Sequence, residues 1–134
     1  MTNLEKVEGI GPIFASKLNQ AGVATTDALL QKGATPEGRQ SLAAATGISR
    51  KLILEWVNLV DLFRIDGVEE EYSDLLEEAG VDTVVELANR NPATLYEKLL
   101  IMNEANNLVN RLPGETDVTK WINQAKTLPR KVHY

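Results

Sequence analysis

The stretch that decides the fold is residues 7–23, which read VEGIGPIFASKLNQAGV. Gly9 and Gly11 flank a single apolar residue, and glycine adopts backbone angles that are closed to other residues. Pro12 suits the first turn of a helix, where its missing N–H costs nothing. Apolar residues then recur at helical spacing as far as Gly22, which supplies a left-handed stop. The stretch therefore predicts a tight loop followed by a short helix.

This stretch resembles the helix-hairpin-helix motif, in which two short helices flank a loop that reads apolar-x-Gly-apolar-Gly. The residues that follow extend the match, because Thr25-Thr26-Asp27 restarts a helix with a threonine at its cap. The resemblance implies that backbone N–H groups of the loop face outward at the start of a helix. Such groups, together with the helix dipole, suit a phosphate.

Composition excludes several classes of function. The chain has 134 residues, of which 43% are hydrophobic and 25% charged, as in an ordinary globular protein. It has no cysteine, which excludes disulfides, thiol catalysis and cysteine-ligated zinc, and His133 is its single histidine. We therefore expect no enzyme activity, no catalytic residue, no metal and no cofactor. With no signal peptide and no apolar run of the roughly 18 residues that a membrane helix needs, we expect a cytoplasmic protein without a membrane partner.

Charge is distributed unevenly along the chain, whose formal net charge is −5. Residues 1–64 carry seven Lys and Arg against six acids, whereas residues 65–134 carry seven against thirteen. Nine acids and no basic residue fall between residues 65 and 88. The net charge argues against a general nucleic-acid binder, but any charged partner must distinguish the two halves.

The first part of the chain recurs at an offset of 58 residues, which indicates a tandem duplication. Asn91-Pro92 then echoes Thr35-Pro36, and Trp121 echoes Trp56. A copy of this size buries too little apolar surface alone, so we expect the copies to pack around one core. The matched pairs are Gly9 and Gly67, Ile10 and Val68, Phe14 and Tyr72, Leu18 and Leu76, Gly22 and Gly80, Thr25 and Thr83, and Leu29 and Leu87.

The expected fold is all-α, with two pseudo-repeated helix-hairpin-helix units and about eight short helices in one compact domain. The first repeat takes residues 1–64, the second residues 65–128, and a C-terminal tail residues 129–134, which is mobile unless it docks. Cap signals predict further helices at Pro36 to Gly47, Arg50 to Leu62, Pro92 towards Asn110, and from Thr116 onward.

The whole chain also resembles a bacterial domain-of-unknown-function family built from two such hairpins. Residues 80–92, 108–113 and 121–129 carry that resemblance, which extends over nearly the full length. It implies the fold, and a likeness at the level of the fold supplies no activity.

The first loop suggests contact with the phosphate backbone of DNA or RNA. By resemblance its N–H groups donate to phosphate, a lysine flanks it, and further basic residues, including Arg39, extend the surface if folding brings them near. The alternative is that the glycines only shape a tight turn. The candidate nucleic-acid-binding residues are Gly9, Ile10, Gly11, Lys17, Arg50 and Lys51.

The second loop suggests a different partner, because glutamate replaces glycine where Gly11 would recur. Three successive glutamates repel a phosphate, and they stabilise a helix start through its dipole. They are therefore either a solvated face or a contact for a basic protein, together with basic residues of the tail. The alternative function is thus a protein–protein adaptor whose partner-binding residues are Glu69, Glu70, Glu71, Arg130 and Lys131.

The aromatic residues lie within helical apolar patterns, so we expect them in or near the core. Base stacking requires exposed aromatic residues interleaved with basic ones, and this sequence lacks that pattern. The oligomeric state is left open by the sequence. The aromatic residues concerned are Phe14, Trp56, Tyr72, Tyr96 and Trp121.

Overall fold

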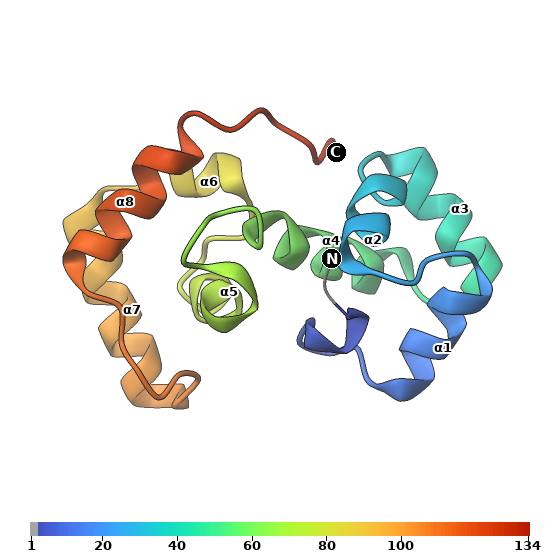
Figure 1. Ribbon diagram of the computed structural model, residues 1–134, viewed down its shortest axis with the longest axis horizontal. Coiled ribbons are helices and arrows are strands. Elements are labelled where there is room, and N and C mark those ends of the chain that lie inside the picture. The colour runs from blue at the N-terminus through green and yellow to red at the C-terminus, as the bar shows by residue number, and fades with distance from the viewer. Residues whose placement is uncertain (1–2) are drawn as a thin grey trace. The chain divides into compact units, whose positions relative to one another are not determined.

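A computed structural model describes residues 3–134, and within them the chain forms eight α-helices and no β-strand (Figure 1). The expected all-α fold is confirmed. No helix in this part of the chain combines the length and the apolar character that crossing a membrane requires. The helices are η1, a short 3-10 helix (Leu4–Lys6), α1 (Pro12–Gln20), α2 (Thr26–Lys32), α3 (Pro36–Thr46), α4 (Arg50–Leu62), α5 (Glu69–Glu78), α6 (Val84–Ala88), α7 (Pro92–Asn106) and α8 (Glu115–Ala125).

The chain divides into two compact units. Unit 1 consists of Met1–Asp61 together with Lys131–Tyr134, and unit 2 consists of Leu62–Arg130. The last four residues thus belong to unit 1, although they follow unit 2 in the sequence.

Unit 1 is built from short helices whose ends are fixed by local hydrogen bonds. Thr25 and Thr35 cap α2 and α3 through their hydroxyl oxygens, which accept from backbone N–H groups at 3.2 and 3.1 Å. Gly47 ends α3 in the left-handed conformation, with φ of 74°. Helix α1 packs against η1 and α3, and α2 packs against α3. The buried side chains include Leu4, Val7, Ile10, Leu18, Val23, Leu29, Leu42, Ile48, Ile53, Trp56, Val57, Val60 and Val132.

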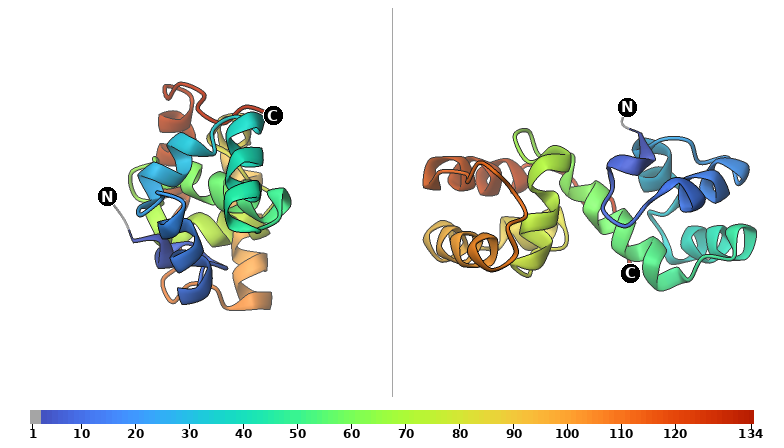
Figure 2. Two further views of the ribbon diagram at one scale, coloured as in Figure 1. Left: turned by 90° about the vertical axis from the view of Figure 1, so that its right-hand side faces the viewer. Right: turned by 90° about the horizontal axis from the view of Figure 1, so that it is seen from below.

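Unit 2 repeats this plan, with a longer third helix, since α7 has 15 residues and α3 has 11. Thr83 and Asn91 cap α6 and α7, and Pro92 occupies the first helical position. Helix α8 lies against α6 and α7, and α7 also contacts α5 (Figure 2). Their buried side chains form one cluster: Leu62, Ile65, Val68, Tyr72, Leu75, Leu76, Ala79, Val81, Val84, Leu87, Leu95, Leu99, Val109, Val118, Trp121, Ile122 and Ala125.

Positions that match in the sequence share their backbone conformation. Gly9 and Gly67 have φ of 94° and 91°, and each stands third in a turn closed by a 3.1 Å backbone hydrogen bond. That φ is the one that the third residue of a type II turn requires, and it favours glycine. Gly22 and Gly80, with φ of 86° and 90°, end α1 and α5 in the same way.

Candidate nucleic-acid interface

The first loop, residues 7–11, is held in place by the buried side chain of Ile10. Ile10 is 3% exposed, and its N–H donates to the carbonyl oxygen of Val7 at 3.1 Å. The Ile10 side chain therefore anchors the loop, and its N–H takes part in the turn. The three residues that follow, Gly11, Pro12 and Ile13, are exposed, and Ile13 reaches 74%.

The start of α1 is open. Gly11 is its N-cap, and a Cβ atom added at Gly11 would have nothing within 4 Å. Within α1 as the structure describes it, the first turn carries no acid and no side chain caps its N–H groups. Gly11 has extended angles, φ −92° and ψ −172°, which any residue adopts. The first turn of a helix presents N–H groups at the positive end of the helix dipole, so an anion is the natural ligand here.

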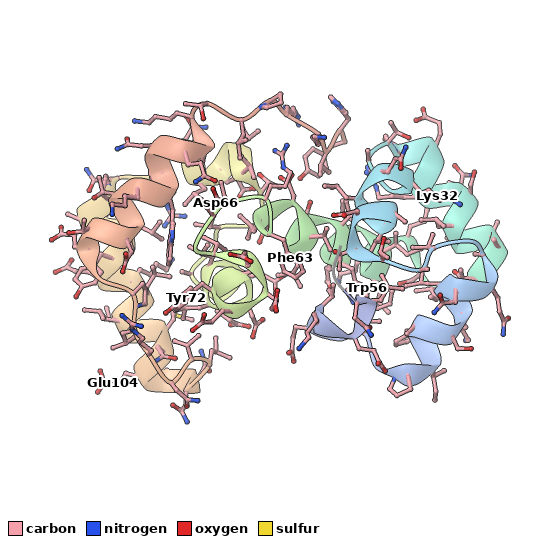
Figure 3. All side chains as sticks on the ribbon, viewed as in Figure 1. Lys32, Trp56, Phe63, Asp66, Tyr72 and Glu104 are labelled. Carbon is pink, nitrogen blue, oxygen red and sulfur yellow. The ribbon has the colours of Figure 1, made fainter. Side chains whose placement is uncertain are left out.

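A row of side chains links this helix start to α4. The Lys17 Nζ atom lies 6.0 Å from the centre of the Phe14 ring, and the Phe14 ring lies 5.2 Å from that of Trp56. Trp56, marked in Figure 3, is 2% exposed, and its Nε1 atom lies 3.1 Å from where a Cβ of Gly9 would stand. The structure thus brings Gly9, Lys17 and Trp56 to one loop.

Arg50 and Lys51 lie at a different helix start. Both are exposed in the first turn of α4, where the Ser49 hydroxyl accepts from the Leu52 N–H at 3.2 Å. An α-helix advances by about 100° per residue, so Arg50 and Lys51 lie about 120° and 140° around the α4 axis from Trp56, the α4 residue that packs on the loop. The structure therefore does not group these two cations with the loop.

Arg39 is buried and does not extend a basic surface. It is 6% exposed, and its Nη1 and Nη2 atoms donate to the carbonyl oxygens of Gly33 and His133 at 2.8 and 2.7 Å. The His133 N–H in turn donates to the Ala34 carbonyl at 2.8 Å. The Arg39 guanidinium therefore binds the last residues of the chain to unit 1.

The tail is docked on unit 1. Val132 is 2% exposed, and the Tyr134 hydroxyl donates to Asn58 Oδ1 at 3.0 Å. Lys131 is exposed at the start of this docked segment, and Arg130 is exposed at the end of unit 2.

The second loop, residues 65–69, differs from the first in its hydrogen bonds and in the charge of the helix that follows it. The N–H groups of Val68 and Glu69 both donate to the Ile65 carbonyl, at 3.1 and 3.4 Å. Glu69 adopts φ of 43°, a left-handed angle that is unusual for a residue with a side chain. Glu69, Glu70 and Glu71 are exposed in the first turn of α5, where their charge complements the helix dipole.

Beside this loop lies a groove of about 250 Å³, lined by aromatic rings and by charges of both signs. The Tyr72 hydroxyl, on α5 (Figure 3), donates to the carbonyl of Arg111 at 2.9 Å. Burial, and next the charge of Glu71, raise the pKa of the Tyr72 phenol. The lining residues are Gly67, Glu71, Tyr72, Arg111, Leu112, Asp117 and Trp121.

Two features were not predicted from the sequence. Carboxylate oxygens of Asp74, Glu77 and Glu78 lie within 4.8 Å of one another on α5, and the spacing of three and four residues would have indicated this. Trp56 was predicted only as a core residue. It is buried as expected, but its indole Nε1 lies beside Gly9 of the loop. The presence of one such glycine and one tryptophan in each repeat could have indicated this contact from the sequence.

Comparison with known proteins gives a family and no solved relative. A family model described as a domain of unknown function (DUF4332) matches residues 8–128. No solved structure matches the chain significantly.

Proposed function

Because the chain belongs to the family of the domain of unknown function DUF4332, whose description assigns no activity, we propose a function from the chemistry of its first loop. The protein is a non-enzymatic binding module that contacts the phosphate backbone of nucleic acid. We interpret residues 4–20 as a helix-hairpin-helix element that makes this contact weakly and without sequence preference.

One observation carries the proposal, namely the open start of α1. Gly11 leaves free space before the helix, and the first turn of α1 has neither a capping side chain nor an acid. The matching turn of α5 carries three glutamates. The same local fold therefore presents a positive helix end at the first loop and a negative surface at the second.

The contact is expected to be weak, because few cations accompany it. Lys17 follows the loop on α1, whereas Arg50 and Lys51 open another helix, and Glu5 and Glu8 are exposed near the turn. With about two or three phosphates neutralised, log affinity should fall against log salt with a slope of about −2 to −3 for duplex DNA. Backbone donors read no base edge, so sequence preference should be absent.

The first prediction concerns Gly11→Glu, which copies the second loop into the first. The angles of Gly11 suit any residue and the space around it is open, so the variant should fold normally while its carboxylate repels phosphate. We expect binding to a short fluorescent DNA duplex, measured by anisotropy at low and moderate salt, to fall at least about tenfold. Glu69→Gly is the matched control and should strengthen binding slightly or leave it unchanged.

Equal affinity of the wild type and Gly11→Glu would remove the first loop from the site. If the wild-type protein does not bind the duplex even at low salt, the proposal fails as a whole. The adaptor function would then take its place, supported by the exposed Glu69, Glu70 and Glu71. Its partner would be a basic protein, and Arg130 and Lys131 are the tail residues to test with it.

A further inference from the structure

We propose that the indole N–H of Trp56 is a donor of the first-loop phosphate site, in addition to the backbone N–H groups. The inference rests on the proposed function and assigns a specific ligand atom, a phosphate oxygen, to a side chain otherwise classed as core.

Trp56 is almost wholly buried, yet its one polar side-chain atom has no acceptor among the residues that the structure describes. The side chain is 2% exposed, and among residues 3–134 Nε1 donates no hydrogen bond. A buried indole N–H ordinarily finds a partner. Nε1 is also not one of the polar atoms sealed from solvent, so the N–H opens to the surface.

Gly9 supplies the opening. A Cβ atom at this position would lie 3.1 Å from Nε1 and 3.9 Å from Cδ1 of Trp56, so a side chain at Gly9 would cover that edge of the ring. Gly9 also needs its positive φ of 94° for the turn. One glycine thus shapes the loop and uncovers the indole N–H.

The uncovered N–H lies beside the other groups of the site. The Trp56 ring contacts Phe14, which belongs to the first turn of α1, and the Lys17 ammonium lies 6.0 Å from the centre of the same Phe14 ring. A phosphate at the start of α1 would meet the helix end, the indole N–H and the ammonium. Hydrogen bonds to an ionised acceptor are stronger than neutral ones, so the indole should contribute measurably.

Unit 2 contains a matched site that should not bind phosphate. Trp121 is 3% exposed, its Nε1 atom lies 3.0 Å from a Cβ position at Gly67, and its ring lies 5.3 Å from that of Tyr72. The groove that it lines also contains the carboxylates of Glu71 and Asp117. Buried Leu75 stands where the offset of 58 would place the counterpart of Lys17. The donor is therefore present in both units, but in unit 2 the one cation of the groove, Arg111, is accompanied by two carboxylates.

The experiment uses the fact that the chain has only two tryptophans. Trp121→Phe leaves Trp56 as the sole indole, and Trp56→Phe leaves Trp121. Each full-length variant is titrated with the short DNA duplex, and both anisotropy and indole emission are recorded. We expect Trp121→Phe to bind like the wild type, with a change in Trp56 emission that saturates along the same curve. Trp56→Phe keeps the ring and loses the N–H, so its affinity should fall about tenfold, with no change in Trp121 emission.

The outcomes separate this inference from the function on which it rests. Wild-type binding with equal affinity in Trp56→Phe would overturn the role of the indole and leave the first-loop proposal standing. Failure of the wild type itself to bind would overturn both. If Trp56→Phe does not fold, as judged by circular dichroism, the emission of Trp121→Phe decides: a spectrum unchanged by saturating duplex would overturn the inference.

Discussion

Tyr72 occupies in unit 2 the position that Phe14 holds in unit 1, and its added hydroxyl changes what that position can do. The hydroxyl donates to the Arg111 carbonyl in a groove that also holds Glu71 and Asp117. The Phe14 ring instead lies near the Lys17 ammonium and the Trp56 indole. The added hydroxyl thus accompanies the change from a site with a lysine to a groove with two carboxylates and one arginine.

This hydroxyl also makes stability depend on pH in the alkaline range. Burial, and next the charge of Glu71, raise the pKa of the Tyr72 phenol above that of an unfolded tyrosine, about 10. The contribution is therefore fully present below about pH 10 and is lost as the pH rises through the folded pKa. Tyr72→Phe should cost about 1 kcal/mol at neutral pH through the lost hydrogen bond. Its thermal midpoint should then fall less than that of the wild type above about pH 10, and parallel curves would contradict this.

At the scale of the element, cap and turn residues predicted most helix ends, and short-range side-chain hydrogen bonds decided two others. Helices α3 and α4 begin and end as expected, because proline, serine and glycine act on their own turns. Helix α7 ends at Asn106 rather than near Asn110, since Asn107 turns left-handed and the Asn103 amide makes two hydrogen bonds with the Val109 backbone.

The start of helix α8 also differs from the predicted one. It begins at Glu115 with Gly114 as its cap, two residues before the predicted cap Thr116, because the Asp117 carboxylate accepts from the Gly114 N–H at 2.9 Å. The burial of Arg39 could not be predicted, because its partner His133 is 94 residues away. In the candidate site, Gly9, Gly11 and Lys17 could be predicted because they lie within one short stretch of sequence. The indole of Trp56 was not predicted, because Trp56 belongs to α4, more than 40 residues after Gly11.

The docked tail is an element whose stability should depend on Arg39. Replacing Arg39 with alanine leaves the carbonyls of Gly33 and His133 without their charged donor. We expect the free energy of unfolding, measured with urea, to fall by about 3 kcal/mol. Arg50→Ala, at an exposed helix start, is the control and should change it by less than about 0.5 kcal/mol. Equal effects of the two substitutions would show that Arg39 does not hold the tail.

At the scale of the whole molecule, charge is partitioned between the two units. Unit 1 carries seven Lys and Arg against six acids, whereas unit 2 carries seven against thirteen. The candidate phosphate site therefore lies in the unit whose net charge does not repel nucleic acid. If the proposed function holds, the net negative charge of unit 2 should lower the affinity for nucleic acid, which agrees with the weak contact expected of the first loop.

That repulsion can be tested without touching the site. Replacing Glu69, Glu70 and Glu71 with glutamine removes three of the thirteen acids of unit 2 and leaves the first loop unchanged. At about 0.01 M salt the screening length is about 30 Å, so the loss of repulsion should tighten duplex binding by about twofold to fivefold. At about 1 M salt the length falls to about 3 Å, and the difference should vanish. Lys17→Gln gives the matched opposite change and should weaken binding while reducing the salt slope by about one. A triple variant that binds like the wild type at low salt would show that the acids of unit 2 do not oppose the first loop.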